Sequence, residues 1–123
     1  MRLNPDNNKH SAISSLNISD TEKTALDELV GFIKKEWPLA KCKLFGSKLR
    51  GTADEESDMD ILITLPCSAT DEIRQKIIHK VFNINLSYGS NISALVVSDE
   101  EWDNSAISVL PVHAFIEEEG MTL

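Results

Sequence analysis

The sequence of 123 residues is poor in cysteine and has neither a surplus of basic residues nor a long apolar run. Cys42 and Cys67 have no metal-ligand spacing, and a chain of this length can bury a core without disulfides. Their scarcity favours a reducing, cytoplasmic location. No stretch approaches the about 18 consecutive apolar residues that span a membrane, and the polar first residues lack the apolar segment of a signal peptide. We therefore expect a soluble globular protein.

The charge of the chain is acidic overall but uneven. A formal net charge of −8 argues against a nucleic acid as the main partner, because binding to that backbone depends on a basic surface. Residues 34–50 nevertheless hold six basic side chains against one acidic side chain, Glu36. Such a basic island would suit a compact polyanion such as a nucleoside triphosphate. On charge alone, a lysine-flanked edge strand with solvated side chains is the simpler interpretation.

Helical spacing first appears after Ser19. Ser19 and Glu22 form a capping-box pattern, and Pro38 ends the helix that they begin. The apolar residues of this helix recur at helical spacing: Leu26, Leu29, Val30, Ile33 and Trp37. A second helix is predicted over residues 70–82, and a third over 112–119, with Pro111 in its first turn and Gly120 as its C-cap.

Three strands are predicted, over residues 41–45, 58–65 and 92–97. The order helix, strand, strand, helix, strand, helix predicts an α/β fold with a small sheet. The sequence contains no repeat and no linker that would divide it. We expect residues 1–18 to be a flexible lead-in and residues 19–123 to form a single domain.

Two carboxylates stand at the start of the second strand. Because side chains alternate along a strand, Asp58 and Asp60 share one face, with α-carbons roughly 6.5–7 Å apart. Residues of the opposite face make a core stripe: Met59, Ile61, Ile63 and Leu65. Neighbouring carboxylates repel each other unless a cation lies between them, and Mg²⁺ commonly takes one or two carboxylates together with substrate phosphates.

A Gly-Ser turn stands upstream of these carboxylates. Gly46 lets the backbone approach a phosphate closely, and Ser47 adds a hydroxyl donor. A lone Gly-Ser turn is weak evidence for a phosphate site. A lone Asp-x-Asp is also weak evidence, because it is often only a solvated strand entrance. An EF-hand does not fit, because Asp60 runs straight into an apolar strand without a glycine turn. The combination is more specific and indicates metal-assisted phosphoryl or nucleotidyl transfer.

This stretch resembles the signature of the DNA polymerase β-type nucleotidyltransferase superfamily, in its minimal nucleotidyltransferase branch. The signature is Gly-Ser, ten residues, then Asp-x-Asp, and it falls here on Gly46, Ser47, Asp58 and Asp60. Other residues stand where the branch commonly has basic, Arg, Gly and Ser residues: Lys48, Arg50, Gly51 and Ser57. The similarity extends over about residues 20–123 and includes the later segments ISALVVSDEEW and FIEEEGMTL.

The resemblance implies a mixed three-stranded sheet backed by helices, with Mg²⁺ and a nucleoside triphosphate, often ATP, as ligands. It implies that Asp58 and Asp60 are catalytic metal ligands and that Gly46, Ser47 and Lys48 bind the triphosphate. Many proteins of this branch pair with a small helical HEPN-type protein in toxin–antitoxin modules, and some transfer AMP to that partner. The sequence leaves a homodimer open.

One residue departs from the superfamily pattern. Active members generally have a third carboxylate on the third strand, which helps to activate the attacking hydroxyl group. In this chain the expected position falls on Ser93, and Asp99, Glu100 and Glu101 follow too far along. We expect the chain to bind metal and triphosphate without the third carboxylate, because the first two aspartates supply this binding. The transfer step, in contrast, lacks the carboxylate that helps to activate the attacking hydroxyl group.

Three functions remain open at this point. The favoured one is Mg-dependent transfer of AMP from ATP to a hydroxyl acceptor, whose site a partner chain would complete. The second is a catalytically weak module that binds nucleotide or neutralises its partner by contact. The third is an acidic interaction protein with no nucleotide role.

Overall fold

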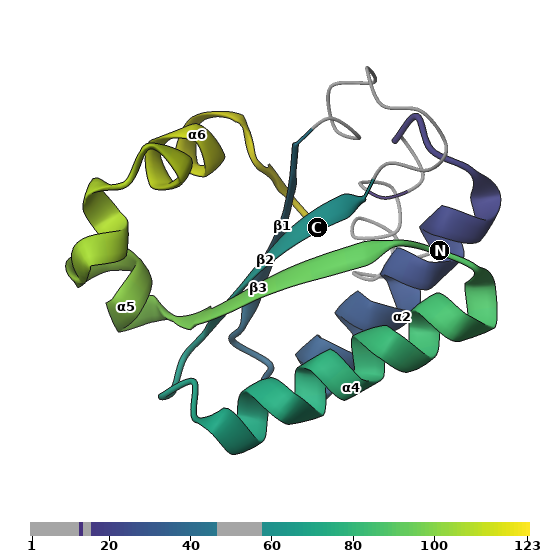
Figure 1. Cartoon of the computed structure of the whole chain (residues 1–123), viewed down its shortest axis with the longest axis horizontal. Coiled ribbons are helices and arrows are strands. Elements are labelled where there is room, and N and C mark those ends of the chain that lie inside the picture. Colours follow the sequence, from purple (N-terminus) through teal and green to yellow (C-terminus); the bar gives the residue numbers. More distant parts are fainter. Residues whose placement is uncertain (1–12, 14–15, 47–57) are drawn as a thin grey trace, which may run out of the picture.

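The computed structural model describes residue 13 and residues 16–46 and 58–123. Figure 1 shows a sheet with two long helices on one side and the C-terminal helical segment on the other. The elements are α2 (Asp20–Glu36), β1 (Lys41–Phe45), β2 (Met59–Leu65), α4 (Asp71–Tyr88), β3 (Ile92–Ser98), α5 (Asp99–Asn104), η1 (Ala106–Val109), α6 (Pro111–Glu119) and β4 (Met121–Thr122). No helix within these ranges combines the length and the hydrophobicity that crossing a membrane requires.

Helix α2 begins at the predicted capping box. The Glu22 N–H donates to Ser19 Oγ at 3.1 Å, and the Ser19 N–H donates to Glu22 Oε1 at 3.0 Å. These two bonds satisfy backbone donors that the first turn would otherwise leave unpaired. The predicted apolar stripe is buried at four positions: Leu26, Leu29, Val30 and Ile33. The first predicted helix is therefore confirmed.

Helix α4 is longer than predicted. The pattern gave a helix over residues 70–82, whereas α4 continues to Tyr88. Gly89 ends it in the left-handed region, at a φ of 65°. The helix extends because Ile84, past residue 82, continues the buried face that Ile77 and Val81 begin.

The sheet has four strands in the order β3-β2-β1-β4, where the sequence predicted three. Strand β1 is antiparallel to both β2 and β4, and β2 is parallel to β3, so the predicted mixed sheet is confirmed. The strand that was missed, β4, pairs with Lys43 and Leu44 over only two residues. Two residues are too few to show the alternation by which a strand is predicted.

The two faces of the sheet are covered differently. One face holds the main core, where β2 packs against α2 and α4 with the predicted stripe of Met59, Ile61, Ile63 and Leu65. The other face carries a smaller cluster of Leu62, Val97, Trp102 and Ile116. Ser93 and Leu95 of β3 are exposed on that second face. The second face is therefore open near the start of β3.

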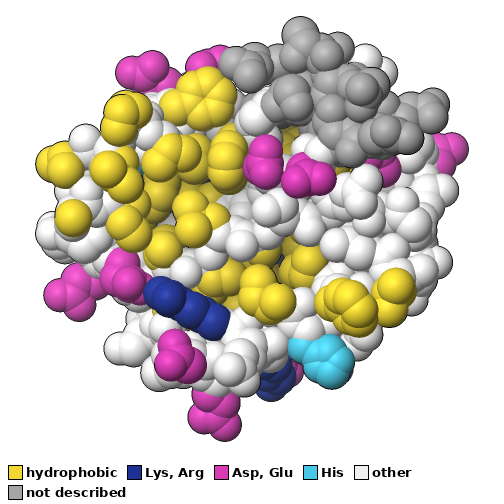
Figure 2. Space-filling model, viewed as in Figure 1, with side chains coloured by type: hydrophobic (Ala, Val, Ile, Leu, Met, Phe, Trp, Pro, Cys, Tyr) yellow, Lys and Arg dark blue, Asp and Glu magenta, His cyan; other side chains and the backbone are white. Residues whose placement is uncertain are grey.

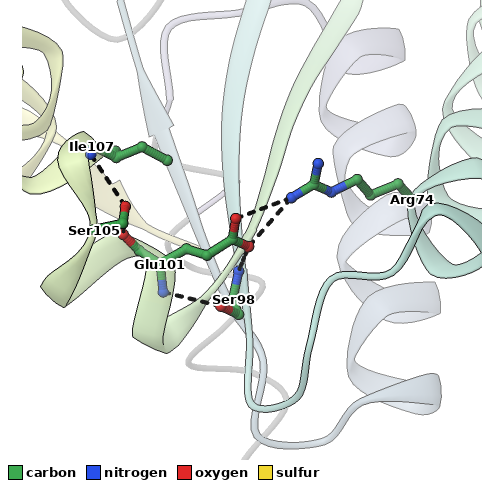
Figure 3. Close-up of polar contacts among 5 residues, drawn as sticks. All are labelled: Arg74, Ser98, Glu101, Ser105 and Ile107. Carbon is green, nitrogen blue, oxygen red and sulfur yellow. Dashed lines mark hydrogen bonds and ion pairs between the residues drawn. The ribbon is translucent and has the colours of Figure 1, made fainter.

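The segment that covers part of the second face begins with a capping box that the sequence analysis overlooked. The Glu101 N–H donates to Ser98 Oγ at 3.0 Å, and the Ser98 N–H donates to Glu101 Oε1 at 3.1 Å. Arg74 of α4 reaches the same carboxylate at 3.3 and 3.4 Å (Figure 3). Since this ion pair is largely exposed and contributes little alone, the cap is the main reason that α5 starts here.

The lead-in expected over residues 1–18 lies mostly outside the described residues. Ile13 and Leu16 are described, and both are buried in the main core cluster. The domain boundary at residue 19 remains a prediction.

Candidate active site

Asp58 and Asp60 lie at the start of β2. Asp58 directly precedes the strand and is exposed, while Asp60 is the second residue of the strand and is partly buried. Met59, between them, is fully buried in the main core, so alternation turns Asp60 to the other face. The Met59 N–H donates to the Asn91 carbonyl at 2.8 Å, which fixes the start of β2 beside the start of β3. The open face of the sheet therefore carries Asp60 at its edge.

Burial raises the pKa of the Asp60 carboxyl group, and the negative charge of Asp58 raises this pKa further. Both effects mean that the ionised carboxylate is less stable here than in water. A cation beside the two carboxylates would offset this cost, and Mg²⁺ binds carboxylate oxygens. Asp58 and Asp60 therefore fit a divalent metal. The described residues contain no group of three or more His, Cys, Asp or Glu side chains placed to hold one.

Gly46 lies against the carboxylate of Asp60. Strand β1 ends at Phe45, which is the register partner of Asp60 on β2. Gly46 follows with a φ of 90°, a left-handed conformation that glycine adopts easily. A Cβ atom added to Gly46 would lie 2.7 Å from Asp60 Oδ2. The fold thus brings together the glycine of the predicted turn and the second predicted aspartate.

Ser47 and Lys48, which the resemblance assigns to the triphosphate, lie outside the described residues. Two lysines of the basic island are engaged within the chain. Lys34 donates to the Ala40 carbonyl, and Lys43 lies 3.7 Å from a carboxylate oxygen of Glu117. These two lysines therefore already interact with groups of this chain.

Ser93 lies beside Asp60 on the neighbouring strand. Strands β2 and β3 are parallel, and Asp60 is the register partner of Ser93. Register partners share a face here, since Met59 and its partner Ile92 are both buried in the main core. Ser93 is exposed and lies on the open face, one strand spacing, about 4.8 Å, from Asp60. The position expected for a third carboxylate is thus adjacent to the second.

Two apolar residues that the sequence analysis did not single out flank this site. Phe45 is the partner of Asp60 on β1, and Leu95 follows Ser93 by two residues with 38% of its surface exposed. Both lie on the face of Asp60 and offer apolar contact to the organic part of a ligand. Alternation along each strand predicts on which face of the sheet these two side chains lie. Their closeness to Asp60 depends on the strand pairing.

A separate cavity of about 410 Å³ lies at the other end of β2 and β3. Its lining includes Thr70 at the start of α4 and Ser98 and Glu101 at the start of α5. Because a strand rises about 3.3 Å per residue, this end of β2 is roughly 17 Å from Asp60. No residue that the sequence singled out as a site candidate lines this cavity.

Comparison with known proteins gives a family match that includes the residues of this candidate site. The model of the nucleotidyltransferase domain family matches residues 26–113, which include Gly46, Asp58, Asp60 and Ser93. Two proteins of Methanocaldococcus jannaschii, each named "Putative protein adenylyltransferase", are similar to this chain. One is 36% identical over 104 residues, which cover 83% of this chain and 97% of the relative. The other is 43% identical over 53 residues, which cover 43% of this chain and 54% of the relative, about half of its length.

Proposed function

Because this chain belongs to the nucleotidyltransferase domain family and is a transferase, we propose that it transfers AMP from ATP, with Mg²⁺, to a hydroxyl group of a partner protein. The observation that carries the proposal is the pair of carboxylates, Asp58 and Asp60, at the open start of β2. The names of the two relatives support the choice of an adenylyl group and a protein acceptor.

The proposed reaction exchanges a phosphoanhydride bond of ATP for a phosphate ester bond to the acceptor. The acceptor oxygen forms a bond to the α-phosphorus of ATP, the bond from that phosphorus to the oxygen bridging the β-phosphorus breaks, and pyrophosphate leaves. The hydroxyl proton passes to a base or to solvent. A bound Mg²⁺ would neutralise negative charge on the phosphates. Asp58 and Asp60 would hold that ion, and the ionised state of both is the competent one.

We assign triphosphate binding to Gly46, Ser47 and Lys48 on the strength of the motif. A hydroxyl donor and an ammonium group directly after a glycine turn suit phosphate oxygens. Phe45 and Leu95 would contact the nucleoside or the acceptor, because they lie on the same face as Asp60.

A second candidate function is favoured by Ser93. The residue beside Asp60 on β3 is a hydroxyl and not a carboxylate, so a base that the wider superfamily uses is missing from this position. Under this alternative the chain binds nucleotide, or neutralises its partner by contact, and transfers slowly. Ligand binding and transfer must therefore be measured separately.

We expect Mg-ATP to raise the melting temperature of the protein, because a ligand that binds only the folded state stabilises it. ATP with chelator is the control, and we expect it to give a smaller rise. Incubation with ATP labelled in its α-phosphate is expected to label the partner chain. A rise without labelling would favour the second function, and the absence of any rise would contradict both.

The proposed acceptor is a small helical protein of HEPN type, with this chain as the antitoxin of the pair. Helix α4 carries a surface that suits such a partner, a stripe of Ile78, Phe82 and Leu86 that are 49%, 58% and 68% exposed. Figure 2 shows hydrophobic side chains on this part of the surface, at the lower right of the view, next to a histidine. Residues four apart lie on one face of a helix, so the stripe can pack along a helix of another chain.

Three basic residues of α4 pair with acidic residues of neighbouring elements. Lys76 pairs with Glu36, and Lys80 lies 3.3 Å from a carboxylate oxygen of Glu28, so both lysines turn toward α2. Arg74 turns toward α5. These three basic side chains of α4 are therefore engaged with neighbouring elements.

We expect Phe82→Glu to abolish co-elution with a HEPN-type partner protein, without lowering the melting temperature. Val109→Glu is the matched control, because Val109 is 81% exposed and lies in η1, in the C-terminal segment on the other side of the sheet from α4. Light scattering on the isolated chain distinguishes the partners: a dimer that Phe82→Glu dissociates would assign the stripe to a second copy of this chain. Retained co-elution would contradict the proposed surface.

A further inference from the structure

Gly46 and Asp60 make a contact that only glycine allows. A Cβ atom at position 46 would lie 2.7 Å from Asp60 Oδ2, but 3.6 and 3.8 Å from Asp60 Cγ and Cβ. The first distance is well below ordinary non-bonded contact, whereas the other two are close to it. The nearest obstacle to a side chain at position 46 is thus the end of the Asp60 carboxylate.

The backbone of Asp60 is held on both sides. Strand β2 is an inner strand, and Asp60 is in register with Phe45 on β1 and with Ser93 on β3. A shift of this backbone would disturb two hydrogen-bonded ladders. The less costly response to a side chain at position 46 is rotation of the Asp60 side chain, which moves its oxygens away from their present place.

We infer that Gly46 is a positioning residue for Asp60. Because Gly46 has no side chain, the Asp60 carboxylate can occupy the space beside it, and this sets where the carboxylate lies. This role needs no phosphate near Gly46, so it is separate from the triphosphate binding that the motif implies. It rests on the proposed function only where Asp60 is taken to hold the metal.

Gly89 provides the matched control. Gly46 has two reasons to be glycine, its positive φ and its contact with Asp60, whereas Gly89 has only the first. The φ of Gly89 is 65°, and a Cβ atom added there would have no neighbour within 4 Å. Gly89→Ala therefore measures the cost of the left-handed backbone, and Gly46→Ala measures that cost together with the contact.

The experiment compares melting temperatures of Gly46→Ala and Gly89→Ala, each with Asp60 present and with Asp60→Ala. With Asp60 present, we expect the larger fall for Gly46→Ala. With Asp60→Ala, we expect the fall for Gly46→Ala to become smaller and that for Gly89→Ala to stay the same, because the interfering oxygens are gone. If Gly46→Ala alone fails to fold, recovery of folding in the double variant supports the same inference. A fall for Gly46→Ala that is the same in both backgrounds would overturn it.

Metal binding gives a readout that a purely structural role would not move. We expect Mn²⁺, titrated without nucleotide and followed by electron paramagnetic resonance, to bind Gly46→Ala about 10–100-fold more weakly than wild type. Gly89→Ala should keep the wild-type affinity, and a wild-type affinity in folded Gly46→Ala would overturn the positioning role. A wild-type protein that binds no Mn²⁺ would instead contradict the proposed function, and the melting temperatures would still decide whether the contact fixes Asp60.

Discussion

Replacing Asp60 by asparagine is expected to lower nucleotidyl transfer by at least about 10²-fold, the usual scale for one electrostatic contact at a transferring group. Asparagine keeps the size of the side chain but removes the charge that would hold a divalent metal. We expect a similar loss for Asp58→Asn. The measurement is transfer of label from ATP to the partner chain, with Asp103→Asn as a control at an exposed acid of α5. Wild-type transfer by either site variant would contradict the assignment.

Asp60→Asn is also expected to stabilise the protein when no metal is bound. The pKa of Asp60 is raised in the folded state, by burial first and by Asp58 second. The unfolded chain therefore loses this proton at a lower pH than the folded chain does. As pH rises from the ordinary aspartate range through the raised pKa, the folded state binds more protons than the unfolded state, and stability falls. At neutral pH the wild type bears this whole cost, and Asp60→Asn does not.

Chemical unfolding at several pH values tests this sign. We expect Asp60→Asn to be more stable than wild type at pH 7, and expect the difference to vanish well below the ordinary aspartate pKa of about 3.9. A difference that persists unchanged in acid would show that the effect is not one of charge. Lost transfer together with retained or increased stability would separate a functional role for Asp60 from a structural one.

Period and capping patterns predicted the parts of this fold that depend on neighbours in sequence. The box at Ser19 and Glu22 and the alternating stripe of β2 were visible, because each needs only a few adjacent residues. The box at Ser98 and Glu101 has the same spacing, so the sequence also contains the signal for the start of α5. Strand β4 could not be predicted from the sequence, because two residues show no periodicity.

The geometry of the candidate site depends instead on strand pairing. Alternation predicts that Asp58 and Asp60 share a face, and the motif names Gly46. Neither predicts that Gly46 touches Asp60 Oδ2, because that contact follows from the register of β1 on β2. The place of Ser93 beside Asp60 likewise follows from the register of β2 and β3. Registers are set by the packing of whole strands, so a local pattern does not contain them.

The second large effect is expected at Ser93. Ser93 is exposed and lies next to Asp60 on the open face of the sheet. An aspartate at this position would stand where a base can accept the proton of an attacking hydroxyl group, and positioned bases contribute about 10²–10⁴-fold to such reactions. We expect Ser93→Asp to raise the rate of transfer at least about tenfold. Affinity for Mg-ATP should change less, because Asp58 and Asp60 already supply the carboxylates that bind it.

Two comparisons make the Ser93→Asp test specific. Ser93→Asn has nearly the size of aspartate but no charge, so we expect no gain in rate from it. A third carboxylate next to Asp60 should also lower the stability of the protein without metal at neutral pH, because the repulsion that already raises the pKa of Asp60 would increase. Added Mg²⁺ should restore more stability to Ser93→Asp than to wild type. Unchanged transfer by a folded Ser93→Asp that binds Mg-ATP would mean that the base comes from elsewhere. The proposed partner chain, which would bring the acceptor to this face, would be the place to look for it.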